Sequence, residues 1–259
     1  MDGFLQGFSV FLLVFCRITS FFVSSPLFAI RQVPAPFKIG LGFFVSLIVY
    51  LAGGMPRTVP QDATYLLHVI HEVLAGLLLG YLFYLFFEVA HISGAFVDTM
   101  MGYGMANIVD PMTGASAPLT GNFKYYLLIL VFLAMNGHHY MLAALMDSYE
   151  WLPMAGDLYA AIAAGNLTEQ LARTFATTFL LGFQLAAPVL VAMFLTDVGL
   201  GFLAKTAPQF NVFVVGLQVK ILVGLLVMMA ALAGFGAFCS YLMSVLFHHL
   251  RLLMAAITG

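Results

Sequence analysis

Charged residues are scarce in this chain: 8% of its 259 residues are Asp, Glu, Lys or Arg, and the formal net charge is -2. A soluble domain carries about 25% charged residues, whereas 63% of this chain is hydrophobic and its mean hydropathy is +1.05. This small number of charged residues cannot cover a water-facing surface. The composition therefore predicts an integral membrane protein. The absence of a basic excess argues against a nucleic-acid partner.

Cysteine is also rare. Cys16 and Cys239 lie far apart in the sequence, each inside an apolar run. Two buried, unreactive thiols are therefore expected, rather than a disulfide or a metal-binding pair.

Motifs for catalysis and cofactor binding are missing. The chain has no Walker loop, no dinucleotide fingerprint, no Gly-x-Ser-x-Gly elbow and no His-Glu-x-x-His. Glu88 and His91 have the Glu-x-x-His spacing of di-iron bundles, but that site needs a second such pair. His68, His71 and Glu72 share a helical face by their spacing, yet on one helix they lie about 30 Å from Glu88. We therefore expect no enzyme, no metal and no cofactor.

Long apolar runs dominate the sequence. They cover residues 4–30, 39–52, 65–97, 125–146, 175–203 and 212–250, and a weaker stretch at 151–168 is typical of a short helix or surface loop. About 20 helical residues cross the ~30 Å hydrocarbon core, so the third and last runs are too long unless a break occurs, for example at Gly234 and Gly236. The runs predict an all-α membrane protein, part of whose apolar surface meets other protein. Without repeats or linkers, residues 1–259 are expected to form one membrane domain.

Five ionisable residues inside or beside these runs are candidate functional residues: Arg17, Glu88, Asp98, Asp197 and Lys220. Charges at such positions are costly and face a partner or water. One interpretation is that they pair with one another, or with neighbouring subunits, and fix helix register. The other is that they line a hydrated path. Their scatter along the chain argues against a proton relay.

Residues 100–123 have no helical period and are rich in glycine, proline and methionine. Irregular backbone cannot face lipid, so this segment is expected to pack against protein or line a cavity. Our interpretation is that it lies in a passage through a membrane assembly and closes it. The candidate plug residues are Met105, Asn107, Val109, Asp110, Pro111 and Met112.

Several short motifs occur together in a fixed order along nearly the whole chain. They are Arg17, Ser25-Pro26-Leu27-Phe28, Arg31-Gln32-Val33-Pro34, Lys38, Gly76 and Gly80 ahead of Glu88, Val109-Asp110-Pro111, Asn136-Gly137-His138, Pro188, and the stretch from Ala207 to Phe213. This ordered set resembles the FliR family of flagellar type III export-gate proteins, which has a homologous subunit, SctT, in virulence-type secretion. Asn136-Gly137-His138 followed by Asp147-Ser148 favours the flagellar branch.

The resemblance implies a subunit that assembles with FliP and FliQ, joined by FlhB and FlhA, into an export gate for unfolded flagellar proteins. It implies a location in the bacterial inner membrane, at the flagellar basal body. It also implies a FliP-like part, residues 1–174, fused to a FliQ-like helical hairpin, residues 175–259, and an internal loop that plugs the closed pore. One departure is Gln218-Val219, where many members have a proline ahead of the position of Lys220.

Two other classes of function fit the sequence less well. A self-sufficient secondary transporter or ion channel would show symmetry between halves and paired broken helices, and the sequence shows neither. A polytopic membrane enzyme would need a polar catalytic cluster, for which the sequence gives no evidence.

Overall fold

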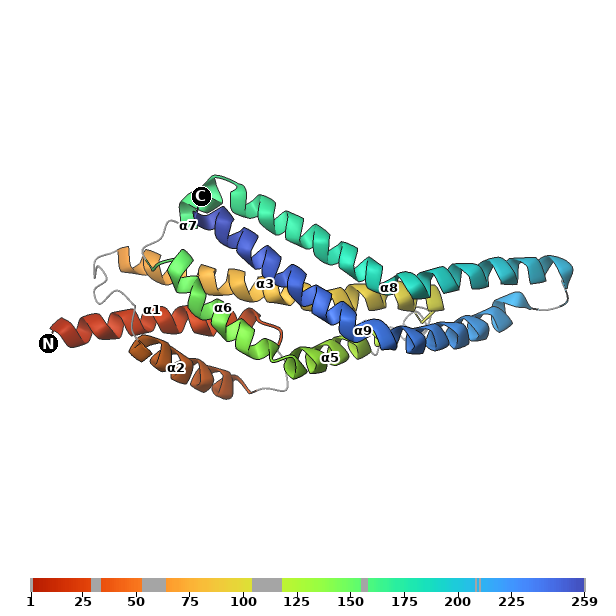
Figure 1. The fold of residues 1–259 in the computed structure, drawn as a ribbon, viewed down its shortest axis with the longest axis horizontal. Helices are drawn as coiled ribbons and strands as arrows, with labels where there is room; N and C mark the ends of the chain where they lie inside the picture. Colours follow the sequence, from red (N-terminus) through yellow and green to blue (C-terminus); the bar gives the residue numbers. More distant parts are fainter. Residues whose placement is uncertain are drawn as a thin grey trace. The chain divides into compact units, whose positions relative to one another are not determined.

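The computed structural model describes residues 2–28, 34–52, 64–103, 118–154, 158–207, 209 and 211–258. The regular structure within these ranges is entirely helical (Figure 1). The helices are α1 (Asp2–Ser24), α2 (Ala35–Ala52), α3 (Thr64–Met101), α5 (Leu119–Ala134), α6 (Gly137–Trp151), α7 (Leu158–Ala163), α8 (Asn166–Thr206) and α9 (Val212–Thr258). The predicted all-α membrane protein is confirmed.

Five of the described helices are long and apolar enough to cross a membrane: α1, α2, α3, α8 and α9. The consecutive helices α5 and α6 are a candidate for a further, broken span. α3, α8 and α9 contain 38, 41 and 47 residues. At 1.5 Å per residue they would reach about 57 to 70 Å if straight. This is about twice the thickness of the hydrocarbon core, so each has more apolar length than lipid alone can cover.

Two of the predicted apolar runs contain a helix end that the apolar pattern does not show. In each case a local feature of the backbone ends the helix. α1 ends at Ser24 and continues as a turn, in which the Phe28 N–H donates to the Ser25 carbonyl at 3.2 Å. Pro26 disfavours helical backbone at Ser25. The predicted run 125–146 is two helices, because Asn136 adopts a left-handed conformation with φ of 58°. Asn tolerates this conformation better than most residues.

The C-terminal helices are longer than predicted. α8 begins at Asn166, directly after Gly165, whose φ is +80°. α9 continues through Gly234 and Gly236 without the break considered there. Each of these glycines costs about 1 kcal/mol relative to alanine, which a helix of 47 residues tolerates.

The described helices fold into two compact units. Unit 1 comprises Met1–Phe86, Asn136–Thr174 and Leu246–Gly259, and unit 2 comprises Phe87–Met135 and Phe175–Val245. α3, α8 and α9 each contribute one part to each unit.

Unit 1 is built on close contact between α1 and α3. A Cβ atom added to Gly76 would clash with the Arg17 carbonyl, and one added to Gly80 would lie 2.8 Å from the Phe21 carbonyl oxygen. Phe21 also packs edge-on against Phe83, with ring centroids 6.0 Å apart. The small residues of the Gly76–Gly80 pattern therefore let the two backbones approach, as such patterns do between membrane helices.

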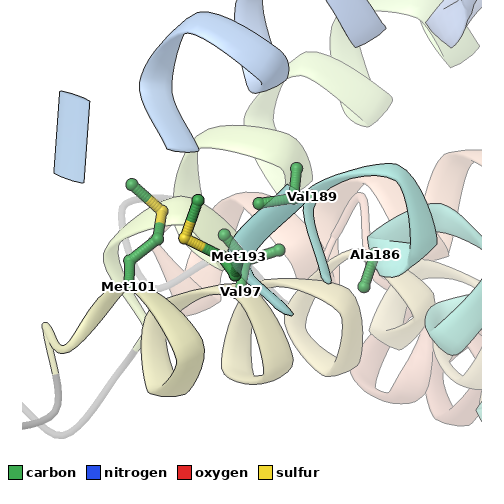
Figure 2. Packing of buried hydrophobic residues seen from close by; sticks show 5 residues of the cluster. All are labelled: Val97, Met101, Ala186, Val189 and Met193. Carbon is green, nitrogen blue, oxygen red and sulfur yellow. The ribbon is translucent and has the colours of Figure 1, made fainter. Parts of the chain in front are cut away.

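Unit 2 has an apolar core between α3 and α8. Figure 2 shows its five fully packed members: Val97, Met101, Ala186, Val189 and Met193. α9 packs against the end of α3 at Gly224, where an added Cβ would lie 2.6 Å from the Met101 Cε. The glycine provides space for the methionine side chain.

Candidate functional site

The predicted plug residues Met105, Asn107, Val109, Asp110, Pro111 and Met112 lie outside the described residues. The structure describes only the two ends of the predicted irregular segment 100–123, and these differ from the prediction: residues 100 and 101 belong to α3, and residues 119–123 belong to α5. α3 ends at Met101, and Pro118 immediately precedes α5.

Arg17 lies at the centre of a buried polar cluster in unit 1. Its Nε donates to Glu72 Oε2 at 2.6 Å and its Nη2 to Glu72 Oε1 at 2.9 Å, a bidentate ion pair between α1 and α3. Nη1 donates to the carbonyl oxygen and the hydroxyl of Ser148 at 3.1 and 3.2 Å, and Nη2 to the Leu152 carbonyl at 2.8 Å. All five guanidinium N–H groups therefore have an acceptor.

Two rings complete this cluster. The Tyr149 ring covers the Arg17 guanidinium at 4.2 Å, a favourable cation–π geometry. His71 Nδ1 lies 3.3 Å from Glu72 Oε1. Arg17 and Glu72 are both 0% exposed. The cluster therefore joins α1, α3 and α6 through charges that water does not reach.

A second polar cluster joins the end of α3 to the start of α5 in unit 2. Both Asp98 carboxylate oxygens lie 3.3 Å from the Thr120 backbone nitrogen, whose N–H they accept. The Thr120 hydroxyl donates to the Gly94 carbonyl at 3.2 Å. Lys124 Nζ donates to the Ser93 hydroxyl at 2.7 Å. A carboxylate at the first turn of a helix satisfies an orphan N–H and complements the helix dipole.

The remaining predicted residues form two smaller pairs in unit 2. Glu88 Oε2 lies 3.2 Å from His91 Nδ1, and the His91 ring stacks on Tyr125 with centroids 4.6 Å apart. Asp197 Oδ1 lies 2.5 Å from Lys220 Nζ, which links α8 to α9. The five candidate residues thus lie in four separate clusters, each with a partner in this chain.

The histidines of α3 do not converge on a common ligand. His68 Nδ1 faces the Met154 carbonyl at 3.1 Å, whereas His71 faces Glu72. Within the described ranges, no group of three or more His, Cys, Asp or Glu side chains is arranged to hold a metal ion. Cys16 and Cys239 are free thiols.

Two functional partners were missed by sequence reasoning. Glu72 was considered only beside His68 and His71, although it is the one carboxylate within an apolar run among the first 87 residues. A buried arginine needs a carboxylate, and that requirement identifies Glu72. In the sequence, His248 and His249 beside Arg251 are typical of an interfacial helix end, whereas in the structure His249 is 7% exposed, with its Nδ1 3.0 Å from the Thr174 hydroxyl.

Comparison with known proteins places the chain in a family. The family described as "Bacterial export proteins, family 1" matches residues 8–246. The flagellar biosynthetic protein FliR of Bacillus subtilis (strain 168) is 37% identical over 233 residues, which cover 90% of this chain and 90% of that protein. The chain belongs to the FliR family. The predicted resemblance is confirmed.

Other FliR-family relatives extend the comparison to both branches of type III export. FliR of Escherichia coli (strain K12) is 28% identical over 234 residues, covering 90% of this chain and 87% of that protein. The Yop proteins translocation protein T of Yersinia pestis is 30% identical over 182 residues, covering 70% and 69%. This FliR-family chain is therefore a component of a type III export apparatus, and its relatives are named for biosynthesis and translocation, not for a reaction.

Proposed function

We propose that this chain is a non-enzymatic structural and gating subunit of the flagellar type III export gate. With FliP and FliQ it forms the channel through which unfolded flagellar proteins are secreted, and FlhB and FlhA join that assembly. Its location is the bacterial inner membrane, at the flagellar basal body. Family membership over residues 8–246 and the 37% identity with a flagellar relative support the flagellar form of this proposal.

The observation that carries the proposal is the uncovered apolar surface of the long helices. In the most apolar 18-residue windows of α2, α8 and α9, 17%, 33% and 11% of residues are buried within the chain. Large side chains such as Phe194, Phe202 and Met229 are 66–68% exposed. Because α8 and α9 are also about twice as long as the hydrocarbon core is thick, other protein subunits must cover part of this surface.

The two parts of the proposed fusion are residues 1–174, the FliP-like part, and residues 175–259, the FliQ-like hairpin. The hairpin is supported by the short connection between α8 and α9, whose adjoining ends lie side by side (Figure 1). Leu200 of α8 lies against Gly216 of α9, and Asp197 pairs with Lys220.

We also propose that the stretch between α3 and α5 plugs the closed channel, with Met105, Asn107, Val109, Asp110, Pro111 and Met112 at its centre. Methionine is flexible and polarizable, so it can seal against surfaces of variable shape. The Asp98–Thr120 contact supports this role, because it holds the residues on either side of the segment together.

The candidate charges have two proposed roles. Arg17 and Asp98, which are 0% and 7% exposed, fix helix register within the chain. Glu88 and Asp197, with side chains 25% and 46% exposed, lie at subunit contacts, and Lys220 accompanies Asp197 there. Charges on apolar helices face protein or water, not lipid.

Purification in mild detergent tests the proposal against a self-sufficient transporter or ion channel. Co-migration of the chain with FliP and FliQ in a defined complex is the expected result. A stable lone chain that binds or conducts a solute would contradict it.

A further inference from the structure

Lys124 differs from the other buried cations of the described chain. Arg17 is paired with Glu72, and the partly buried Lys220 with Asp197 at 2.5 Å. Lys124 is 5% exposed, and its single hydrogen bond among the described residues goes to the neutral Ser93 hydroxyl. An ammonium has three donors, so two of its N–H groups have no acceptor in the described part of the chain.

The same unit contains a carboxylate, Asp98, that faces the start of α5. Its two oxygens, however, accept the Thr120 N–H, and no ion pair joins Asp98 to Lys124 within the described ranges. A buried charge without a bonded partner is costly, so the site needs a further acceptor.

A cavity lies beside this lysine. Its volume is about 20 Å³, and it is lined by Lys124 of α5, Leu185 and Val189 of α8, and Met228, Ala231, Leu232 and Phe235 of α9. Such a volume holds one water-sized polar group. Ala231 at its rim is exposed, whereas Val189 and Phe235 are buried at 1% and 6% exposure. The cavity is therefore an apolar pocket that is open on one side. Its one charged lining group is the Lys124 ammonium.

We propose that this pocket receives the carboxylate of an Asp or Glu side chain carried on an apolar helix of a neighbouring subunit. The charge is complementary, and an anionic oxygen satisfies the unpaired ammonium donors. The rim is apolar, and few residues of α9 around it are buried within the chain. An apolar helix that carries the carboxylate can therefore pack there. The inference rests on the proposed assembly.

The size of the pocket favours a protein side chain over a lipid headgroup. Its volume of about 20 Å³ admits one water-sized polar group, so one carboxylate oxygen fits, whereas a lipid phosphodiester does not. The pocket lies at the middle of α8, since Leu185 is 19 residues after its start and 21 before its end, where a helix packed alongside can deliver this oxygen.

The test is zero-length cross-linking of the co-purified complex with dicyclohexylcarbodiimide, an apolar carbodiimide. It activates a carboxyl group, which an amine in contact attacks to form an amide with release of the urea. Mass spectrometry is expected to find the Lys124 peptide joined to an Asp or Glu peptide of another subunit. The Lys220–Asp197 pair serves as an internal positive control, because it gives a link within the chain.

Two variants sharpen the test. Lys124→Arg keeps the charge but cannot form the amide, so the link disappears while the complex still co-purifies. Lys124→Met removes the charge, and we expect at least tenfold less co-purified complex, since truncating one partner of a buried charge pair weakens binding by more than tenfold.

Four results would overturn the inference. They are a Lys124–Asp98 link alone, a fatty-acid amide on Lys124, a Lys124→Met complex that forms at the wild-type yield, and no Lys124 link although Lys220 links to Asp197. Each of these leaves the proposed gate function intact if the complex co-purifies. A chain that purifies alone would overturn both.

Discussion

Arg17 and Glu72, which are 55 residues apart in the sequence, form a bidentate ion pair from which water is excluded. The remaining guanidinium donors bind Ser148 and Leu152, at the end of α6 and just beyond it. One side chain of α1 thus fixes two other helical segments of unit 1. The ion pair and its hydrogen bonds offset the free-energy cost of removing both charges from water. Removing one partner alone is therefore expected to destabilise the fold more than removing both.

Glu72→Gln is expected to lower the free energy of unfolding by about 3 to 5 kcal/mol, because it leaves the Arg17 charge buried without a counter-ion. Arg17→Met combined with Glu72→Met should be less harmful than either single change, and a double-mutant cycle of thermal unfolding in detergent measures the coupling. Arg173→Ala is the control, since its pair with Glu169 is 70% and 64% exposed and contributes at most about 1 kcal/mol. Additive single effects would contradict the pairing.

Gly80→Ala tests the close approach of α1 and α3. The new Cβ would lie 2.8 Å from the Phe21 carbonyl oxygen, and we expect a loss of about 1 to 3 kcal/mol from this overpacking. Gly199→Ala in α8 is the matched control, because nothing lies within 4 Å of its added Cβ. The control should be neutral or slightly stabilising, since alanine favours a helix more than glycine does. Equal unfolding midpoints for the two variants would show that the contact is not tight.

Asp98→Ala is expected to loosen the start of α5. The carboxylate accepts the Thr120 N–H, and losing a helix cap of this kind costs about 0.5 to 2 kcal/mol. Asp98→Asn retains an acceptor oxygen and should lose less. Hydrogen exchange at the Thr120 amide checks the order, with protection falling from wild type through Asn to Ala. Unchanged protection in Asp98→Ala would mean that the cap does not hold this turn.

The parts of the fold that follow from apolar periodicity were predictable, because burial or lipid contact dictates where long helices form. The run at 212–250, for example, is the body of α9. The break at Asn136 does not show in hydropathy, because it depends on a single left-handed residue; the dipeptide Asn136-Gly137 is the turn signal that could have indicated it. The partner of Arg17 required knowledge of which helices meet, which the pattern within α1 does not contain. Lys124 was overlooked because only the packing of α5, α8 and α9 makes its missing partner evident.

Deletion of residues 106–117 tests the proposed plug. The deleted stretch lies between the described contacts that join Asp98 to Thr120 and Ser93 to Lys124, so these anchors remain and co-purification with FliP and FliQ should persist. The channel, however, loses the segment proposed to close it, and the membrane is expected to leak small ions, measured as a collapse of membrane potential in cells expressing the variant. A second variant replaces the same residues with a Gly/Ser linker of equal length. It removes the apolar side chains, Met112 among them, without shortening the chain, and it should leak as well. Normal ion tightness in both variants, with the complex assembled, would mean that this segment does not close the passage.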